Sequence, residues 1–94
     1  MTKYFISGQS TGGSLAVEKH LNRYFHEHYF HTLVSEDKVA DIIADLEAAQ
    51  DRYFQGSRGK RVAIGKHASY DGGLVFLSIG ALSYTLIKIE REIL

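Results

Sequence analysis

The spacing of the apolar residues changes from helical to strand-like at the loop 55–59, and this change constrains the fold more than any other feature. Before the loop, residues 36–54 carry an apolar stripe at the spacing of an amphipathic helix. The hydroxyl and two carboxylates at 35–37 are typical of a helix start, because they complement its free amides and its dipole. Gly56 supplies a stop. The sequence therefore predicts a helix from about residue 36 to residue 54.

After the loop, the pattern predicts three strands. Residues 61–67 alternate between two faces, and Tyr-Asp-Gly-Gly at 70–73 is a turn signal, since these residues tolerate the positive φ angles of a hairpin. The near-continuous apolar run 74–79 and the longer alternating segment 82–91 follow. We expect these three strands to form an antiparallel meander.

The N-terminal part begins with an aromatic and β-branched run, residues 3–7, which predicts a short strand. A glycine-rich loop, 8–14, then leads into an amphipathic segment from Leu15 to about residue 30, with Ser14 as a plausible N-cap. Periodicity does not settle the end of this segment. Residues 24–34 fit either the helix or a second strand.

These elements predict one α+β domain over residues 1–94. The order β-α-α-β-β-β favours a small antiparallel sheet, joined by the first strand, with two helices packed on one face. The residues that we expect near the core are Ile42, Ile43, Leu46, Leu74 and Ile87.

Composition excludes several classes of protein. The chain has no cysteine, so disulfides and thiolate metal sites are excluded, and its 11 basic and 11 acidic residues argue against non-specific nucleic-acid binding as the main activity. Residues 74–89 are too short and too polar for a membrane helix, and no apolar signal-peptide core follows Met1. We expect a cytoplasmic protein that needs no cofactor.

The glycine loop is a candidate anion or nucleotide site, formed by Gly12, Gly13 and Ser14. Bare amides before a helix can hold a phosphate. A phosphate-binding loop also requires a lysine and a hydroxyl after its second glycine, whereas Ser14 and Leu15 follow here. We therefore expect the loop to act chiefly as a connection between strand and helix.

The run from Tyr24 to His31 alternates aromatic and histidine side chains. No single conformation brings all its histidines together, so we expect no metal site. The run holds more aromatic side chains than a small core obviously needs, which predicts that some contact a partner protein or a second copy of the chain. The candidate contact residues in this run are Tyr24, His28, Tyr29 and His31.

Three aspartates at four-residue spacing, Asp37, Asp41 and Asp45, are predicted to form an acidic row on the second helix, away from its apolar stripe. Like charges at this spacing mildly destabilise a helix. Besides a solvated face, such a row could contact a basic partner protein, imitate phosphate groups, or contact the chain's own basic loop 58–61.

The same loop provides an alternative function, because Arg58, Lys60 and Arg61 could bind nucleic acid through its phosphates. No local signature selects a catalytic nucleophile or base. The sequence therefore favours a small non-catalytic binding protein of the adaptor, inhibitor or accessory kind. It acts in this hypothesis through the aromatic and histidine surface together with the acidic helix face.

Overall fold

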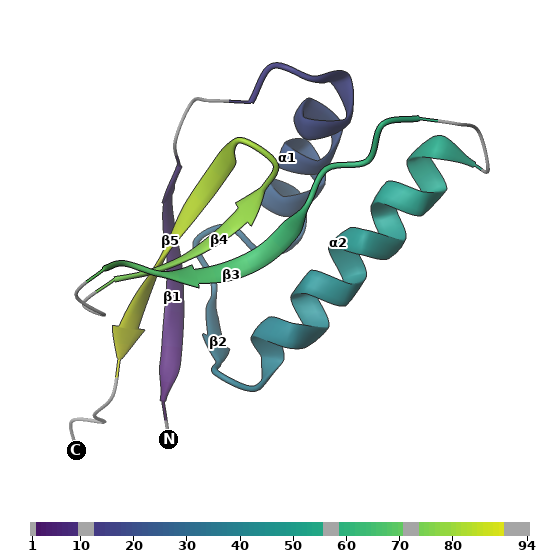
Figure 1. The fold of residues 1–94 in the computed structure, drawn as a ribbon. Helices are drawn as coiled ribbons and strands as arrows, with labels where there is room; N and C mark the ends of the chain where they lie inside the picture. Colours follow the sequence, from purple (N-terminus) through teal and green to yellow (C-terminus); the bar gives the residue numbers. More distant parts are fainter. Residues whose placement is uncertain (1, 10–12, 56–58, 71–73, 90–94) are drawn as a thin grey trace.

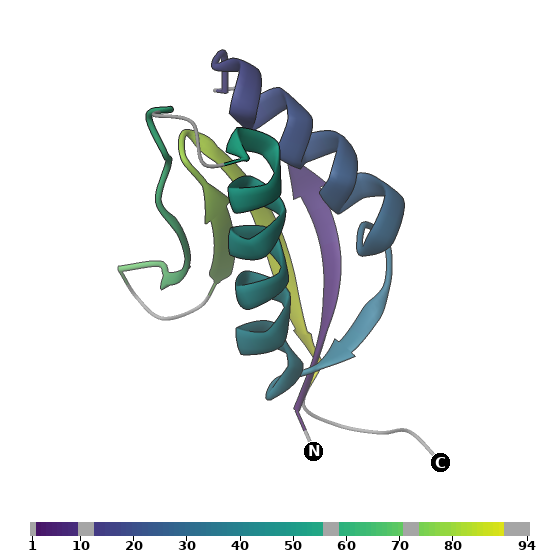
Figure 2. The same cartoon turned by 90° about the vertical axis from the view of Figure 1, so that its right-hand side faces the viewer.

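The computed structural model describes residues 2–9, 13–55, 59–70 and 74–89. It shows two helices and a five-stranded antiparallel sheet, which confirms the predicted α+β class (Figure 1). Figure 2 shows both helices on the same side of the sheet. The opposite face of the sheet is therefore not covered by either helix.

The elements agree with most of the predicted segments. They are β1 (Lys3–Gln9), α1 (Ala16–His28), β2 (Leu33–Ser35), α2 (Lys38–Phe54), β3 (Ile64–Ala68), β4 (Val75–Ile79) and β5 (Leu82–Ile89). Helix α2 begins two residues later than expected because residues 36 and 37 form a turn. Neither helix in the described ranges combines the length and the apolar character needed to cross a membrane.

Residues 24–34 are divided between helix and strand, which resolves the question that periodicity left open. Helix α1 ends where the amides of residues 29 and 30 both donate to the carbonyl of Phe25, at 2.8 and 3.1 Å. His31 then adopts a left-handed φ of 63°, and its amide donates to the carbonyl of Ile6 in β1 at 2.8 Å. After this turn, the short strand β2 runs along the edge of the sheet, where it pairs with β1.

The strand order is β2-β1-β5-β4-β3, so the first strand lies inside the sheet beside the last one. The pairing runs from Lys3 opposite Ile89 to Ser7 opposite Thr85, and the register then shifts between residues 7 and 9. Gly8 occupies this irregularity with φ of 74°, a conformation that side chains other than glycine rarely adopt. The β1–β5 pair therefore connects the first and the last strand of the chain by hydrogen bonds.

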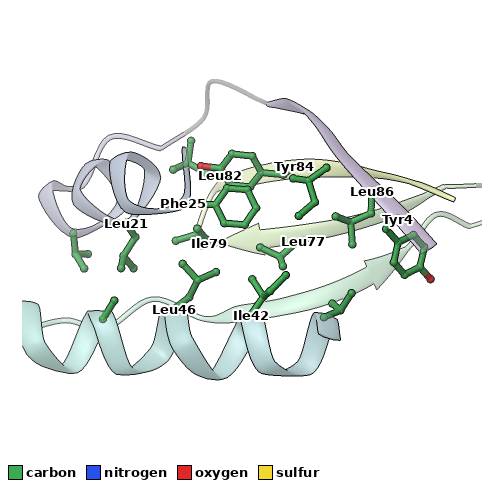
Figure 3. Packing of buried hydrophobic residues seen from close by; sticks show 14 residues of the cluster. Tyr4, Leu21, Phe25, Ile42, Leu46, Leu77, Ile79, Leu82, Tyr84 and Leu86 are labelled. Atoms are coloured by element: carbon green, nitrogen blue, oxygen red, sulfur yellow. The ribbon is translucent and has the colours of Figure 1, made fainter. Parts of the chain in front are cut away.

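The core lies between the helices and the inner face of the sheet (Figure 3). Its fully buried large side chains are Ile6, Leu21, Phe25, Leu46, Leu77, Ile79, Tyr84 and Leu86. The predicted core position of Ile42 and Leu46 is confirmed, and Ile43 packs against the core while partly buried.

Two core predictions are wrong. Ile87 is 46% exposed and Leu74 is 51% exposed. Side chains of a strand alternate between faces, and the buried side chain of β5 at this point is Leu86, so Ile87 lies on the face without helices. Leu74 precedes β4 and is not one of the residues that form the core or pack against it.

Candidate functional site

The start of α1, predicted as a possible anion site, is occupied by a carboxylate of the chain itself. Glu18 is only 3% exposed, and its Oε1 accepts hydrogen bonds from the amides of Ser14 and Leu15 at 3.1 and 2.9 Å. Its Oε2 accepts a bond from the amide of Ala81, in the β4–β5 turn, at 2.7 Å. An external phosphate would compete with Glu18 for the amides of residues 14 and 15.

The electrostatics of Glu18 follow from these contacts. The amide of Ala81, then that of Leu15, lower the pKa of the Glu18 carboxyl below its ordinary value, since each hydrogen bond favours the charged form. The ionised carboxylate thus connects the start of α1 to a turn 63 residues away along the chain. The available sequence signal was a glutamate at the third helical position, which is a common capping arrangement.

The other parts of the glycine loop have structural roles or lie outside the described residues. Gly12 is among the latter. A Cβ at Gly13 would lie 2.6 Å from Cγ of Leu82, so this glycine permits close packing of the loop on β5. The observed N-cap residue of α1 is Leu15, one position after the predicted Ser14.

Two predicted contact residues of the aromatic run form hydrogen bonds with a predicted acidic residue. The Tyr24 hydroxyl donates to the carboxylate of Asp45 at 2.9 and 3.0 Å, and the Tyr29 hydroxyl donates to the same carboxylate. The Tyr29 hydroxyl is the main cause that lowers the pKa of Asp45. Burial, followed by the bond to Asp45, raises the pKa of both tyrosines. The phenols therefore stay protonated and link α1 to α2.

More aromatic side chains of this run lie in the core or pack against it than we predicted. Phe25 is fully buried, and Tyr24, Tyr29 and Phe30 pack against the core. The exposed rings in this run are histidines. His28 stacks on Tyr24 at a ring-centroid distance of 4.2 Å. Of the predicted contact residues in this run, Tyr24 and Tyr29 are therefore partly buried, whereas His28 and His31 are exposed.

His31 and the acidic residues occupy separate places. His31 is exposed and lies parallel to the ring of Phe5, at a centroid distance of 6.1 Å. Asp37 precedes α2 and accepts a hydrogen bond from Ser35 at 2.6 Å, while Asp41 pairs with Lys38 at 3.9 Å.

The predicted acidic row is consequently not a single surface. Asp37 lies outside the helix, and Asp45 turns towards α1, so Asp41 alone has the predicted exposed helical position. Partner binding stays a prediction for all seven candidate residues, which are Tyr24, His28, Tyr29, His31, Asp37, Asp41 and Asp45. Within the described ranges, no three histidine or carboxylate side chains are grouped so that they could hold a metal ion.

The basic loop is partly engaged within the chain. Arg61 pairs with Asp51 at 3.1 Å, and its guanidinium lies 5.1 Å from the centre of the Phe54 ring. Lys60 is exposed, and Arg58 lies outside the described residues. Nucleic-acid binding through this loop stays a prediction. A nucleic-acid phosphate that binds Arg61 would compete with Asp51 for its guanidinium group.

The two helices also border a shallow hollow of about 410 Å³. Its lining includes His20, Tyr24, Arg52 and Tyr53, and the rings of His20 and Tyr53 are in contact at a centroid distance of 4.7 Å. Tyr24, which lines the hollow, donates its hydroxyl hydrogen bond to Asp45. The hollow offers a guanidinium and aromatic rings, without a recognisable catalytic arrangement.

A second candidate surface lies on the sheet face opposite the helices, which we call the open face. Its centre is an apolar row of Leu33, Phe5 and Ile87, which are cross-strand neighbours on β2, β1 and β5. Leu33 and Ile87 are 52% and 46% exposed, and Ile89 on the same face is 39% exposed. The sequence showed the alternation of β5, but we assigned Ile87 to the wrong face.

The residues around the apolar row are mainly polar or small, together with the apolar Ile89 and Phe76. On one side Lys3 lies opposite Ile89, and on the other Ser7 lies opposite Thr85. By alternation, the remaining outward-facing residues are Ser35, Gly65, His67, Phe76, Ser78 and Ser83. Among the described residues of the five strands, none of these outward-facing side chains is a carboxylate. The open face is thus apolar at its centre and nearly neutral around it.

Comparisons of the chain with protein-family models, with curated proteins and with solved structures found no match.

Proposed function

We propose that this protein is a small non-catalytic protein-binding module of the cytoplasm, and that its main contact surface is the open face of the sheet. The observation that supports this proposal is the apolar row of Leu33, Phe5 and Ile87, which lies on the face opposite the two described helices. An antiparallel sheet with one solvated face normally carries polar side chains there. A contiguous apolar patch on such a face is typical of an interaction site.

The open face has the composition of a protein interface. Apolar side chains lie at its centre, and hydroxyl groups such as those of Ser7 and Thr85 lie beside them. Leu33 and Ile87 are each about half exposed, so burial of the exposed part of either one would stabilise a complex by about 1 kcal/mol. His31, a predicted contact residue of the aromatic run, stacks on Phe5 and therefore lies at the border of this face.

A site-specific photo-crosslinker can test whether the open face contacts protein. We would place a photoreactive phenylalanine analogue at position 87 in one variant and at position 47 in a control, because Glu47 is exposed on α2 in the helical layer. Irradiation of cells that produce the protein should give discrete polypeptide adducts from position 87 only. A second substitution on the same face, Leu33→Glu, should abolish these adducts.

Two results would contradict the proposal. One is the absence of adducts from position 87 when position 47 gives them. The other is a set of adducts that Leu33→Glu leaves unchanged, since these would not depend on the apolar row.

A further inference from the structure

We infer that the outer edge of β3 binds an extended peptide segment of another protein as an added strand. Among the strands that the structure describes, β3 is the last in the sheet and pairs with β4 alone. Its other edge is therefore available for strand addition. This edge is separate from the open face, so the inference goes beyond the proposed function and does not rest on it.

The hydrogen bonds around β3 show which of its backbone groups point outwards. The amide of Gly80 donates to the carbonyl of Ala63, and the amide of Ser69 donates to the carbonyl of Leu74, each at 2.8 Å. Positions 63 and 69 therefore face β4, and the direction alternates along the antiparallel strand between them. The residues of β3 whose amides and carbonyls face away from β4 are Ile64, Lys66 and Ala68. We call these three the edge residues.

A side-chain amide already fills the preceding position of the same edge. The backbone of Val62 also faces outwards, and its amide donates to Oε1 of Gln50 at 2.8 Å while its carbonyl accepts a bond from Nε2 at 3.2 Å. Gln50 thus makes both bonds that a neighbouring strand would make. Within the described ranges, no group does the same for the three edge residues. Their donor and acceptor pairs repeat about every 6.8 Å, a spacing that an extended peptide backbone matches.

Gly65 predicts an aromatic side chain in the added strand. A Cβ at this glycine would meet no atom within 4 Å, so the open face is empty there. We expect antiparallel addition, since every pair in this sheet is antiparallel. The partner residue opposite Gly65 then forms a non-hydrogen-bonded pair, in which side chains approach most closely. An aromatic side chain at that place would cover the bare backbone of the edge glycine.

Lys66 predicts a carboxylate in the added strand. Its side chain is exposed on the face of Leu77, its cross-strand neighbour, and forms no ion pair with a described residue. A partner carboxylate beside Lys66 would form a cross-strand ion pair. Glu36 and Asp37 border the same hollow as Lys66, so a single carboxylate fits better than an acidic run. In antiparallel addition, this acidic residue directly precedes the aromatic residue opposite Gly65.

A second copy of β3 is a poorer occupant of this edge. Antiparallel pairing of two copies over all three edge residues would place the two-fold axis at position 66. The two Lys66 side chains would then lie side by side, and like charges directly opposite each other destabilise a sheet. An exposed lysine is one means by which proteins prevent edge-to-edge association. Charge therefore favours an acidic segment of a different chain.

NMR titration of the isotope-labelled full chain with a short capped peptide tests the inference. The peptide consists of threonine and valine residues around one glutamate that is followed by phenylalanine. The amide signals of the three edge residues should shift, with a dissociation constant in the micromolar to millimolar range. In the free protein these amides should exchange with solvent faster than those of residues 65 and 67, which face β4, and the peptide should slow that exchange.

Two N-methylated peptides form a matched pair. In the added strand, the amide of the glutamate opposite Lys66 points to β3, whereas the amide of the following phenylalanine points away. Methylation of the glutamate nitrogen should therefore weaken binding at least about 10-fold. Methylation of the phenylalanine nitrogen should leave the dissociation constant nearly unchanged.

Two protein variants test the same contacts from the other side. Ala68→Pro removes an outward donor and keeps the bonds to β4, since an edge strand tolerates proline where its amide faces solvent; it should weaken binding about 10-fold. Lys66→Glu should weaken binding of the glutamate peptide about 10-fold and strengthen binding of a peptide with lysine at that position. Lys19→Glu, exposed on α1, is the charge-matched control and should change neither constant. Circular dichroism establishes that each variant is folded.

The inference is overturned if millimolar peptide leaves the edge amides unshifted, or if methylation of the glutamate nitrogen does not weaken binding. It is also overturned if the protein alone dimerises with its edge amides protected from exchange, since a second copy would then occupy the edge. Shifts confined to Leu33, Phe5 and Ile87 would support the proposed function and refute binding at β3. Adducts from position 87 test the open face alone, so the two proposals can fail separately.

Discussion

Removal of the buried Glu18 carboxylate should destabilise the fold by more than any other single change to a polar side chain that we consider. Glu18 accepts three backbone hydrogen bonds, from Ser14, Leu15 and Ala81. A hydrogen bond to a charged group contributes about 1.5–3 kcal/mol. Water can reach the amides of residues 14 and 15 after truncation, since both residues are exposed. We therefore expect Glu18→Ala to lower the free energy of unfolding by about 3 kcal/mol.

Glu18→Gln removes the negative charge of the side chain and keeps nearly the same shape. The glutamine carbonyl oxygen can accept one set of bonds, but its NH₂ group would oppose a backbone amide. The expected loss is about 1.5 kcal/mol, or a melting temperature lower by roughly 6–12 °C for a domain of this size. Thermal melting followed by circular dichroism measures the shift. Glu47→Gln, exposed on α2, is the matched control and should change stability by less than about 0.5 kcal/mol.

The pH dependence gives an independent check. The pKa of Glu18 is lower in the folded protein than the ordinary value of 4.5, so its contribution is fully present above that value. The contribution is lost as the pH falls through the folded-state pKa. The stability difference between wild type and Glu18→Gln, measured by urea unfolding, should therefore decrease on acidification below about pH 4.5. A Glu18→Gln variant as stable as wild type at pH 7, or a difference that grows in acid, would refute this account.

Three further changes follow from other buried contacts. Tyr29→Phe removes one hydroxyl from Asp45 and should cost about 1 kcal/mol; the pKa of Asp45, followed by NMR, should rise towards its ordinary value. Gln50→Leu leaves the amide and carbonyl of Val62 without the side-chain bonds at 2.8 and 3.2 Å and should cost about 2 kcal/mol in urea unfolding. Gly80→Ala should lower the melting temperature, since Gly80 has φ of 59° and a Cβ would lie 2.2 Å from Oε2 of the glutamate in α1; unchanged melting would contradict the turn geometry.

The sequence alone determined the elements whose signals are local. Helix α2 follows from its apolar stripe, and strands β3 to β5 follow from the alternation after position 59. The predicted glycine stop at position 56 and most of the predicted turn 70–73 lie outside the described residues, and the observed C-cap of α2 is Gln55. The α+β class follows from the order of these elements. Each of these predictions depends on residues that are close together in the chain, so a single sequence contains the required information.

Only the tertiary structure decided which groups meet. Glu18 contacts Ala81 across 63 positions, and Tyr24 contacts Asp45 across 21, so no local pattern could pair them. The same limit explains the wrong face assigned to Ile87. A period of two separates the faces of a strand, but both faces of β5 carry apolar side chains. Which face became the core was decided by the helices that packed on it, and apolar residues such as Ile87 on the other face stayed partly exposed.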